Sequence, residues 1–164
     1  MLYIFLYLLK ERMINMNIIS EFRGETRWLS NFQEAPILYM GKTYKTVEHM
    51  YQAYKSPVPE ERLAIMTAET PGRAKRMGAL CKLRPDWEEI KFGIMFHAVL
   101  CKFLQHKDLA ERLLATGDAI LEEGNDWGDT YWGICNGEGF NHLGKILMRV
   151  RDILGYSQIH IEKE

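Results

Sequence analysis

The sequence predicts one domain of the α+β class, mainly helical with a few short strands, and three observations lead to this prediction. The chain has 164 residues, of which 47% are hydrophobic and 26% charged, as in ordinary globular proteins with a single core. Six segments carry helix start signals or a helical spacing of apolar residues, whereas strand-like runs are only a few residues long. The chain contains no internal repeat, low-complexity segment or linker, which favours one compact domain.

The first residues are unlike the rest of the chain. Met1 to Leu9 are almost wholly apolar, and Lys10-Glu11-Arg12 then interrupts them. This run is too short to cross a bilayer as a helix, and it lacks the basic start and the small-residue cleavage site of a secretory signal. We therefore predict that residues 1–16 are a non-native or disordered extension. Residues 17–155 would form the domain and residues 156–164 a polar tail.

The domain is predicted to open with short strands. Asn17 to Phe22 reads as a strand, and Ile37 to Tyr44 reads as a hairpin that turns at Gly41-Lys42. Between them, Trp28 to Phe32 is a compact apolar and polar run in which Ser30 and Asn31 favour a turn. The hairpin delivers the chain to the first helix.

The helix from Thr46 to Lys55 is the first candidate for a functional element. Thr46 is suited to cap it, and Glu48 then lies in the first turn, where the helix dipole favours a carboxylate. Glu48, Gln52 and Lys55 are spaced i, i+4 and i+7, so they share one face. Pro57 ends the helix. The alternative is a surface helix with one Glu–Lys pair.

Four further helices are predicted before the next strand, over residues 60–67, 73–83, 87–104 and 108–115. The third has the strongest amphipathic pattern and is predicted to be central to the core. The second begins after Thr70-Pro71-Gly72 and carries Arg73, Lys75 and Arg76 near its start. These cations are either a solvated positive face or a phosphate site at a helix N-terminus.

A glycine-rich segment, residues 124–142, follows a short predicted strand at Asp118 to Glu122. It contains Trp127, Asp129 and Trp132, together with several glycines that disfavour helix and allow backbone to approach a ligand closely. Tryptophan rings can stack on a base, so we predict a binding loop rather than an ordinary surface loop. A final helix is predicted over residues 143–154.

Charge and cysteine content restrict the possible functions. The formal net charge of -1 argues against a protein that coats nucleic acid through a basic surface. The three cysteines, Cys81, Cys101 and Cys135, form no CxxC pair, so neither a zinc site nor a disulfide framework is predicted. No metal, cofactor or membrane association is expected, and a reducing cytoplasmic setting is the simplest inference.

Two segments together resemble the NADAR family, also called YbiA-like. The first is Val47-Glu48-His49 with Gln52-Ala53 and Lys55, and the second is Trp127 to Gly133. Gly139 to Gly144 and Leu147-Met148-x-Val150-Arg151 continue the second match. Supporting matches are Trp28 to Phe32, Ala74-Lys75, Gly78 and Trp87. The resemblance covers residues 18–154.

This resemblance implies a mainly helical N-glycosidase fold and substrates in which ribose C1 is joined to a nitrogen of a base. Two activities are associated with the family. One removes ADP-ribose from guanine in nucleic acid, and the other cleaves phosphoribosylamino-pyrimidine intermediates of riboflavin synthesis. The resemblance also implies a lysine nucleophile, and Lys55 is the matching position.

The predicted catalytic residues are Lys55 as nucleophile on C1, Glu48 for proton transfer and Asp129 to orient ribose hydroxyls or water. The predicted substrate-binding residues are Trp127, Trp132, Gly133, Asn141, Asn31, Gln52, Arg73 and Lys75. The alternative is a module that binds ADP-ribose or another nucleotide without cleaving it. A protein whose loop docks a partner chain is a weaker alternative, and a metal enzyme the weakest, because His49, His142 and Cys135 lack ligand spacing.

Overall fold

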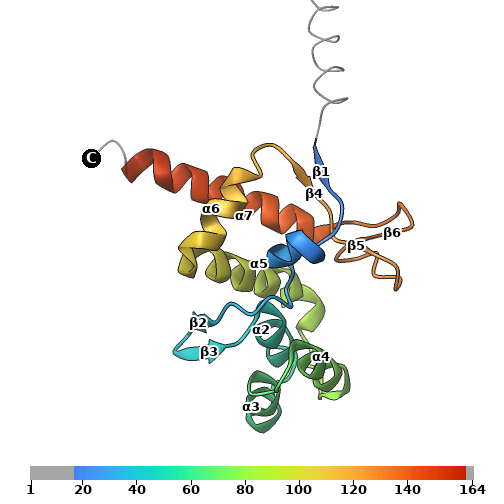
Figure 1. The fold of residues 1–164 in the computed structure, drawn as a ribbon. Coiled ribbons are helices and arrows are strands. Elements are labelled where there is room, and N and C mark those ends of the chain that lie inside the picture. Colours follow the sequence, from blue (N-terminus) through green and yellow to red (C-terminus); the bar gives the residue numbers. More distant parts are fainter. Residues whose placement is uncertain (1–16, 162–164) are drawn as a thin grey trace, which may run out of the picture.

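The long helix α5 (Trp87–Gln105) crosses the middle of the molecule and separates two groups of helices (Figure 1). The computed structural model describes residues 17–161, with side chains through Tyr156, so the predicted extension lies outside the described residues. On one side of α5 lie α2 (Val47–Ala53), α3 (Pro59–Met66) and α4 (Pro71–Leu80); on the other lie α6 (Lys107–Ala115) and α7 (His142–Ile161).

The strands are short and occur in pairs. The strands of the described chain are β1 (Ile18–Ile19) parallel to β4 (Ile120–Leu121), β2 (Ile37–Tyr39) antiparallel to β3 (Lys42–Tyr44), and β5 (Gly124–Asn125) parallel to β6 (Ile134–Cys135). A 3-10 helix, η1 (Gly24–Leu29), follows β1. The prediction of a mainly helical α+β domain with a few short strands is therefore confirmed.

The hairpin turns one residue earlier than predicted. Tyr39 pairs with Lys42, so the two loop residues are Met40 and Gly41 rather than Gly41 and Lys42. Both have positive φ, +47° for Met40 and +73° for Gly41. A two-residue hairpin loop favours this left-handed geometry because its twist matches that of the flanking strands, even though only one of the two residues is a glycine.

Capping residues fix where the main helices begin. The Thr46 hydroxyl accepts from the backbone of His49, so the predicted cap of α2 is confirmed. The Thr70 hydroxyl accepts from the backbone of Arg73 and caps α4, which begins at Pro71 rather than at Arg73 as predicted. The final helix differs from the prediction, because α7 continues through Gly155 to Ile161. Glycine only weakens a helix interior, by about 1 kcal/mol relative to alanine, so it is not an obligatory stop.

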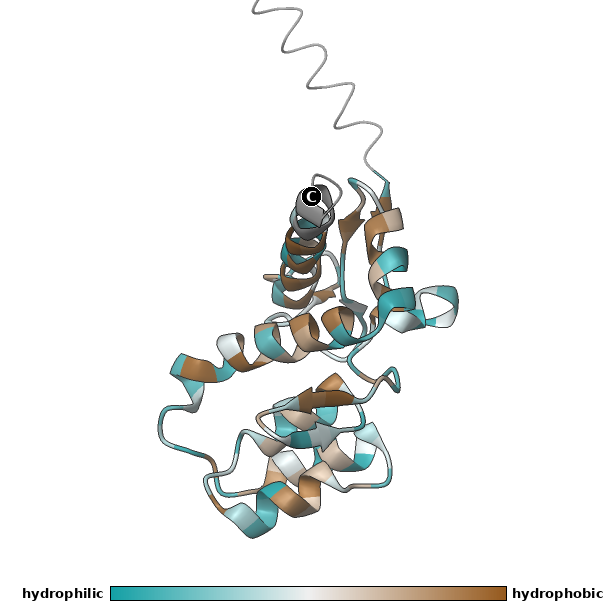
Figure 2. Cartoon of the chain, turned by 90° about the vertical axis from the view of Figure 1, so that its left-hand side faces the viewer, coloured by the Kyte–Doolittle hydropathy of each residue, from teal (hydrophilic) through white to brown (hydrophobic). Residues whose placement is uncertain are grey.

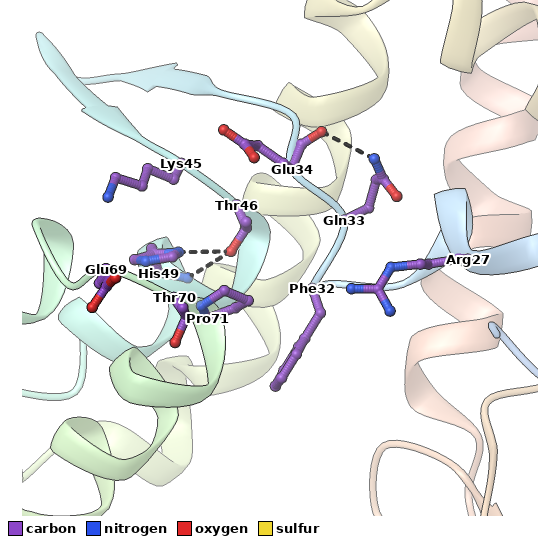
Figure 3. Close-up of a pocket in the computed structure, with 10 residues that line it drawn as sticks. All are labelled: Arg27, Phe32, Gln33, Glu34, Lys45, Thr46, His49, Glu69, Thr70 and Pro71. Atoms are coloured by element: carbon purple, nitrogen blue, oxygen red, sulfur yellow. Dashed lines mark hydrogen bonds between the residues drawn. The ribbon is translucent and has the colours of Figure 1, made fainter. Parts of the chain in front are cut away.

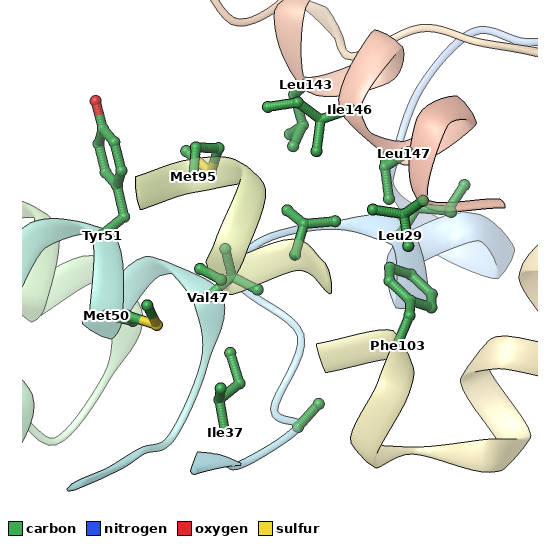
Figure 4. Packing of buried hydrophobic residues seen from close by; sticks show 14 of the residues in the cluster. Leu29, Ile37, Val47, Met50, Tyr51, Met95, Phe103, Leu143, Ile146 and Leu147 are labelled. Atoms are coloured by element: carbon green, nitrogen blue, oxygen red, sulfur yellow. The ribbon is translucent and has the colours of Figure 1, made fainter. Parts of the chain in front are cut away.

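The core joins α5 to both helix groups. Met95 and Phe103 of α5 are buried, as are Val47 and Met50 of α2 and Leu147 of α7 (Figure 4). Each helix carries hydrophobic and hydrophilic residues together, as expected for amphipathic helices around a shared core (Figure 2). Across residues 17–161, no helix has the length and apolar character needed to cross a membrane.

Candidate active site

One large cavity collects most of the predicted site residues. Its volume is about 850 Å³, and it is walled by residues from η1, α2, α4 and the segment that follows β4. Trp127, Asp129 and Trp132 of the glycine-rich loop line the same cavity as Glu48 and Lys55. The loop and the α2 segment, far apart in sequence, therefore form a single site.

Lys55 lies just beyond the end of α2, in a turn rather than in the helix as predicted. The backbone NH of Lys55 donates to Gln52 O at 3.2 Å, and its carbonyl accepts from Arg84 N at 2.8 Å, so the turn is held on both sides. The Lys55 ammonium nitrogen is 5.5 Å from the Tyr51 ring and 5.8 Å from the Trp87 ring.

The surroundings of Lys55 favour its neutral amine form. Burial lowers the pKa of the Lys55 amine from its ordinary value, and the charge of Lys75 acts in the same direction. The carboxylate of Glu48 opposes this shift. A neutral amine is the nucleophilic form of lysine, so the site makes more of that form available near neutral pH.

Glu48 is held inside the cavity wall. Its side chain is only 6% exposed, and Gln52 Nε2 donates to Glu48 Oε1 at 2.8 Å. Its backbone NH donates to the Asn31 carbonyl at 3.1 Å. Burial raises the pKa of Glu48, although the Gln52 hydrogen bond and the nearby charges of Lys75 and Lys55 oppose the increase. The net result is a pKa above the ordinary value of a glutamate, so the protonated form of Glu48 is favoured more than in water.

The glycine-rich loop presents Asp129 and two tryptophans to the cavity. Asp129 Oδ1 accepts from the backbone of Tyr131 and of Trp132, which leaves Oδ2 outside the hydrogen bonds of the loop. Trp132 meets the Tyr51 ring edge-on, with centroids 5.5 Å apart. Trp127 is 53% exposed at the cavity mouth, where the Arg23 guanidinium lies 5.2 Å from its ring. These rings give the cavity an aromatic wall.

The positive charge near α4 is arranged differently from the prediction. Lys75, Arg76 and Gly72 line the cavity, whereas Arg73 is exposed and does not. Lys75 Nζ lies 5.9 Å from the rings of both Phe32 and Trp127. The α4 segment therefore brings two side-chain cations to the cavity, and Arg76 rather than Arg73 accompanies Lys75.

The other predicted binding residues divide into two groups. Asn31 and Gln52 line the cavity, and Asn31 Nδ2 also donates to Met95 Sδ at 3.3 Å. Gly133 and Asn141 do not line it. Asn141 uses its side-chain amide within the protein, since Nδ2 donates to Leu121 O at 2.8 Å and Oδ1 accepts from Glu123 N at 3.1 Å.

Glu123 lines the cavity and was not identified from the sequence. Burial raises its pKa to about 7, and the Asp129 charge adds to the increase, while Arg23 and Lys75 oppose it. The sequence did carry a signal. Side chains two positions apart face the same side of an extended chain, so Glu123 lies on the side of the buried Leu121 of β4, and this spacing could have identified it.

A second, smaller cavity has Phe32 in its lining (Figure 3). It measures about 360 Å³ and shares Arg27 and Phe32 with the larger cavity. His49 lies in its wall, where its ring nitrogens are engaged by the Thr46 hydroxyl at 2.8 Å and the Ala68 carbonyl at 3.1 Å. Glu48, Lys55 and Asp129 do not reach this cavity, so the larger one holds the candidate chemistry.

No group of three or more His, Cys, Asp or Glu side chains in the described part of the chain is arranged to hold a metal ion. The larger cavity brings together the amines of Lys55 and Lys75 and the carboxyl groups of Glu48, Glu123 and Asp129.

Comparisons with known proteins identify the family of the chain. The NADAR domain model matches residues 18–155. An N-glycosidase of Nostoc punctiforme is 43% identical over 129 residues, covering 75% of this chain and 82% of the relative. N-glycosidase YbiA of Escherichia coli is 38% identical over 160 residues, covering 96% of this chain and 94% of YbiA.

The fold comparison gives the same result. The NMR structure of E. coli YbiA matches with a TM-score of 0.80 at 37% identity, over 87% of this chain and 88% of that one. The maize chloroplast riboflavin biosynthesis protein PYRR is 39% identical over 127 residues, which cover 69% of this chain and 20% of that protein. Because the domain model and the relatives span most of the chain, this protein belongs to the NADAR family.

Proposed function

We propose that this NADAR protein is an N-glycosidase that cleaves the bond between ribose C1 and a base nitrogen. The observation that carries the proposal is one cavity in which a lysine with a lowered pKa and a buried carboxyl group meet an aromatic wall. The E. coli and Nostoc relatives are both named N-glycosidases. The setting is proposed to be cytoplasmic, because Cys81, Cys101 and Cys135 are free thiols.

Lys55 would supply the nucleophile. The lone pair of its neutral amine attacks ribose C1, the C1–N bond breaks, and the bonding electron pair leaves with the base nitrogen. The attacking nitrogen then loses one proton to Glu48, and the ribose ring opens as the second nitrogen proton passes to the ring oxygen, which gives an imine. Water adds to C1 of this imine, Glu48 returns its proton to the Lys55 nitrogen as that nitrogen departs, and the proton released by the added water neutralises the base. The alternative route is direct attack by water, with Glu48 as the base.

The loop residues would hold the two parts of the substrate. Asp129 orients ribose hydroxyls or the attacking water through the carboxylate oxygen that the loop does not use. Trp127 and Trp132 wall or stack against the leaving base, because every base has a π-face that an indole can cover.

The cations of the cavity indicate a phosphorylated substrate. Lys75, Arg76 and the start of α4 at Gly72 line one side, and Arg23 and Arg27 contribute from the η1 segment. Guanidinium groups and a helix N-terminus both stabilise phosphate. A ribose joined to a base and carrying phosphate fits both candidate substrates, ADP-ribosylated guanine in nucleic acid and a phosphoribosylamino-pyrimidine. The name of the maize relative favours the second.

Release of free base tests the proposal. The protein is incubated separately with ADP-ribosylated guanine DNA and with the aminopyrimidine phosphoriboside, and the released base is measured by chromatography. Wild-type protein is expected to cleave at least one of them. Glu48→Gln should bind that substrate with unchanged affinity and lower the cleavage rate by about 10²–10⁴-fold, because an amide cannot transfer the protons.

Two outcomes would contradict the proposal. Wild-type protein that binds ADP-ribose but releases no base from either substrate would show the non-cleaving binding module instead. Glu48→Gln that cleaves at the wild-type rate would remove Glu48 from the mechanism. Circular dichroism of the variant checks that a loss of cleavage is not a loss of fold.

A further inference from the structure

We infer that Glu123 is the catalytic acid that protonates the base nitrogen as it leaves, while Glu48 serves the Lys55 side of the reaction. This inference rests on the proposed glycosidase function and assigns a role to a residue that the proposed mechanism does not use. A base expelled without a proton carries the electron pair of the broken bond as negative charge, which is costly unless a donor is present.

The position of Glu123 is the first argument. Its side chain lines the same cavity as Lys55, Glu48 and the two tryptophans. Glu123 Oε2 is shielded from bulk solvent, and no group of the described chain donates a hydrogen bond to it. A buried carboxylate oxygen without a donor is costly, whereas a protonated carboxyl group can itself donate to a ligand in the cavity. The environment therefore suits the acid form.

The second argument is that hydrogen bonds hold both the backbone NH and the carbonyl of Glu123. Glu123 N donates to Asn141 Oδ1 at 3.1 Å, and Glu123 O accepts from Ile134 N at 2.9 Å. Gly133 lies so close that a methyl group there would overlap the Glu123 carbonyl oxygen. Gly133 and Asn141, two residues predicted to bind substrate, thus fix this segment instead. A catalytic side chain requires such a rigid support.

The charges around Glu123 complete the assignment. Burial raises its pKa to about 7, Asp129 and Glu48 act in the same direction, and the cations Arg23 and Lys75 oppose them. Burial raises the pKa of Glu48 as well, but Gln52 Nε2 donates a hydrogen bond to Glu48 Oε1, whereas no group of the described chain donates to Glu123 Oε2. Two carboxyl groups in different environments can take the acid and the base role in one site.

The proton balance of the step is complete. Lys55 attacks C1, the C1–N bond breaks, and the proton of the Glu123 carboxyl moves to the base nitrogen together with that electron pair. The released base is therefore neutral, and Glu123 is left as a carboxylate. When water adds to the imine, Glu123 recovers a proton from that water, so the only net reactant is one water molecule.

Glu123→Gln tests the assignment against Glu122→Gln, a matched control on the neighbouring residue, which does not line the cavity. Two substrates are compared, the nitrogen-linked riboside that the wild type cleaves and 4-nitrophenyl ribofuranoside 5-phosphate, whose leaving group is stable as an anion. Glu123→Gln is expected to lower kcat/KM on the first by about 10²–10⁴-fold and on the second by less than about threefold. Glu122→Gln should behave as wild type on both.

The pH profile of the wild type gives a readout that does not depend on a variant folding. On the nitrogen-linked substrate, kcat/KM is expected to fall as pH rises above about 7, because Glu123 then loses the proton that it must donate. This fall of kcat/KM above about pH 7 should be absent when the wild type acts on the nitrophenyl riboside. It should be present when Glu122→Gln acts on the nitrogen-linked substrate.

The outcomes separate this inference from the proposed function. Equal losses on both substrates would show that Glu123 supports the fold or binding and would overturn the inference, as would near-wild-type cleavage of the nitrogen-linked substrate. Wild-type kcat/KM on the nitrogen-linked substrate that does not fall above about pH 7 would overturn the inference as well. In these three cases the glycosidase function stands. Failure of the wild type to cleave any riboside would overturn both.

Discussion

Lys102 is a buried cation outside the active cavity that supports one of its walls. Its side chain is 1% exposed, and its Nζ donates to the carbonyls of Trp28 at 2.7 Å and Ser30 at 3.0 Å. Ser30 and the next two residues, Asn31 and Phe32, line the cavity. Burial lowers the pKa of Lys102 to about 7, so charging this residue opposes folding.

The pH dependence of stability follows from that shift. Between about pH 7 and the ordinary lysine pKa near 10.4, the unfolded state binds more protons at Lys102 than the folded state. The free energy of unfolding should therefore rise with pH in this window, by at most about 1.4 kcal/mol per pH unit from this group. The cost of charging Lys102 is fully present below the window and disappears above it.

Lys102→Met tests this prediction, because methionine has a similar length and no charge. Urea unfolding at several values between pH 7 and 9.5 should give a smaller increase in stability with pH for Lys102→Met than for the wild type. Lys107→Met, which changes a lysine whose side chain is 91% exposed, should keep the wild-type slope. Equal slopes for Lys102→Met and the wild type would show that the buried amine does not titrate in this range.

The contact of α2 with α4 determines how precisely Glu48 is held. Gly78 of α4 is buried against Gln52 of α2, and a methyl group there would overlap Gln52 Oε1 and lie 2.9 Å from Gln52 Cβ. Gln52 in turn donates to Glu48. The glycine therefore allows a close approach of two helices that carry the amide, the carboxyl group and the cavity lysine Lys75.

Gly78→Ala is expected to destabilise the protein by about 1–3 kcal/mol through overpacking, and to lower kcat by displacing Gln52 from Glu48. Gly93→Ala in α5 is the control, because a Cβ there meets nothing within 4 Å. That control should stabilise the protein by about 0.5–1 kcal/mol, as alanine is the better helix former. Thermal unfolding and turnover are measured together. A Gly78→Ala variant as stable and active as the control would contradict this account of the helix contact.

Local sequence signals were sufficient to predict helices that begin at a capping residue or show a regular apolar spacing. Thr46 and Thr70 mark helix starts through side chains that bond to backbone three residues later, and the apolar spacing of α5 indicates its buried face. Longer-range pairings leave no such local signal. The parallel pairing of β1 with β4 depends on where α5 and α6 place the intervening chain, and so does the position of Glu123.

At the scale of the whole molecule, the site is an assembly of segments that are far apart in sequence. Lys55 follows α2, Lys75 comes from α4, and Asp129 from the glycine-rich loop. Sequence resemblance placed most of these residues in one site, because the motif residues recur in order. The resemblance could not distinguish residues that line the cavity from residues that support its wall. Trp132 lines the cavity, whereas the side-chain amide of Asn141 hydrogen-bonds to the backbone of Leu121 and Glu123.

The cavity also combines groups of opposite charge. Carboxyl groups of Glu48, Glu123 and Asp129 line the same cavity as Arg23, Lys75 and Arg76. A carboxylate stabilises the positive charge that develops at C1, and a protonated carboxyl group can donate to the leaving base. A phosphate group is instead stabilised by cations. One cavity can therefore bind both the reacting C1 and the phosphate of a ribosyl phosphate. The near-neutral net charge of the chain is compatible with this local arrangement.

Borohydride trapping tests the central claim, that the Lys55 amine forms a covalent bond to ribose C1. Wild-type protein is mixed with the cleaved substrate and sodium borohydride, and intact mass and peptide mapping locate any reduced adduct. We predict one added sugar phosphate on the peptide that contains Lys55, none in Lys55→Ala, and an unchanged position in Lys75→Ala, which removes another cavity lysine. An active enzyme that gives no adduct, or an adduct that persists in Lys55→Ala, would contradict the claim.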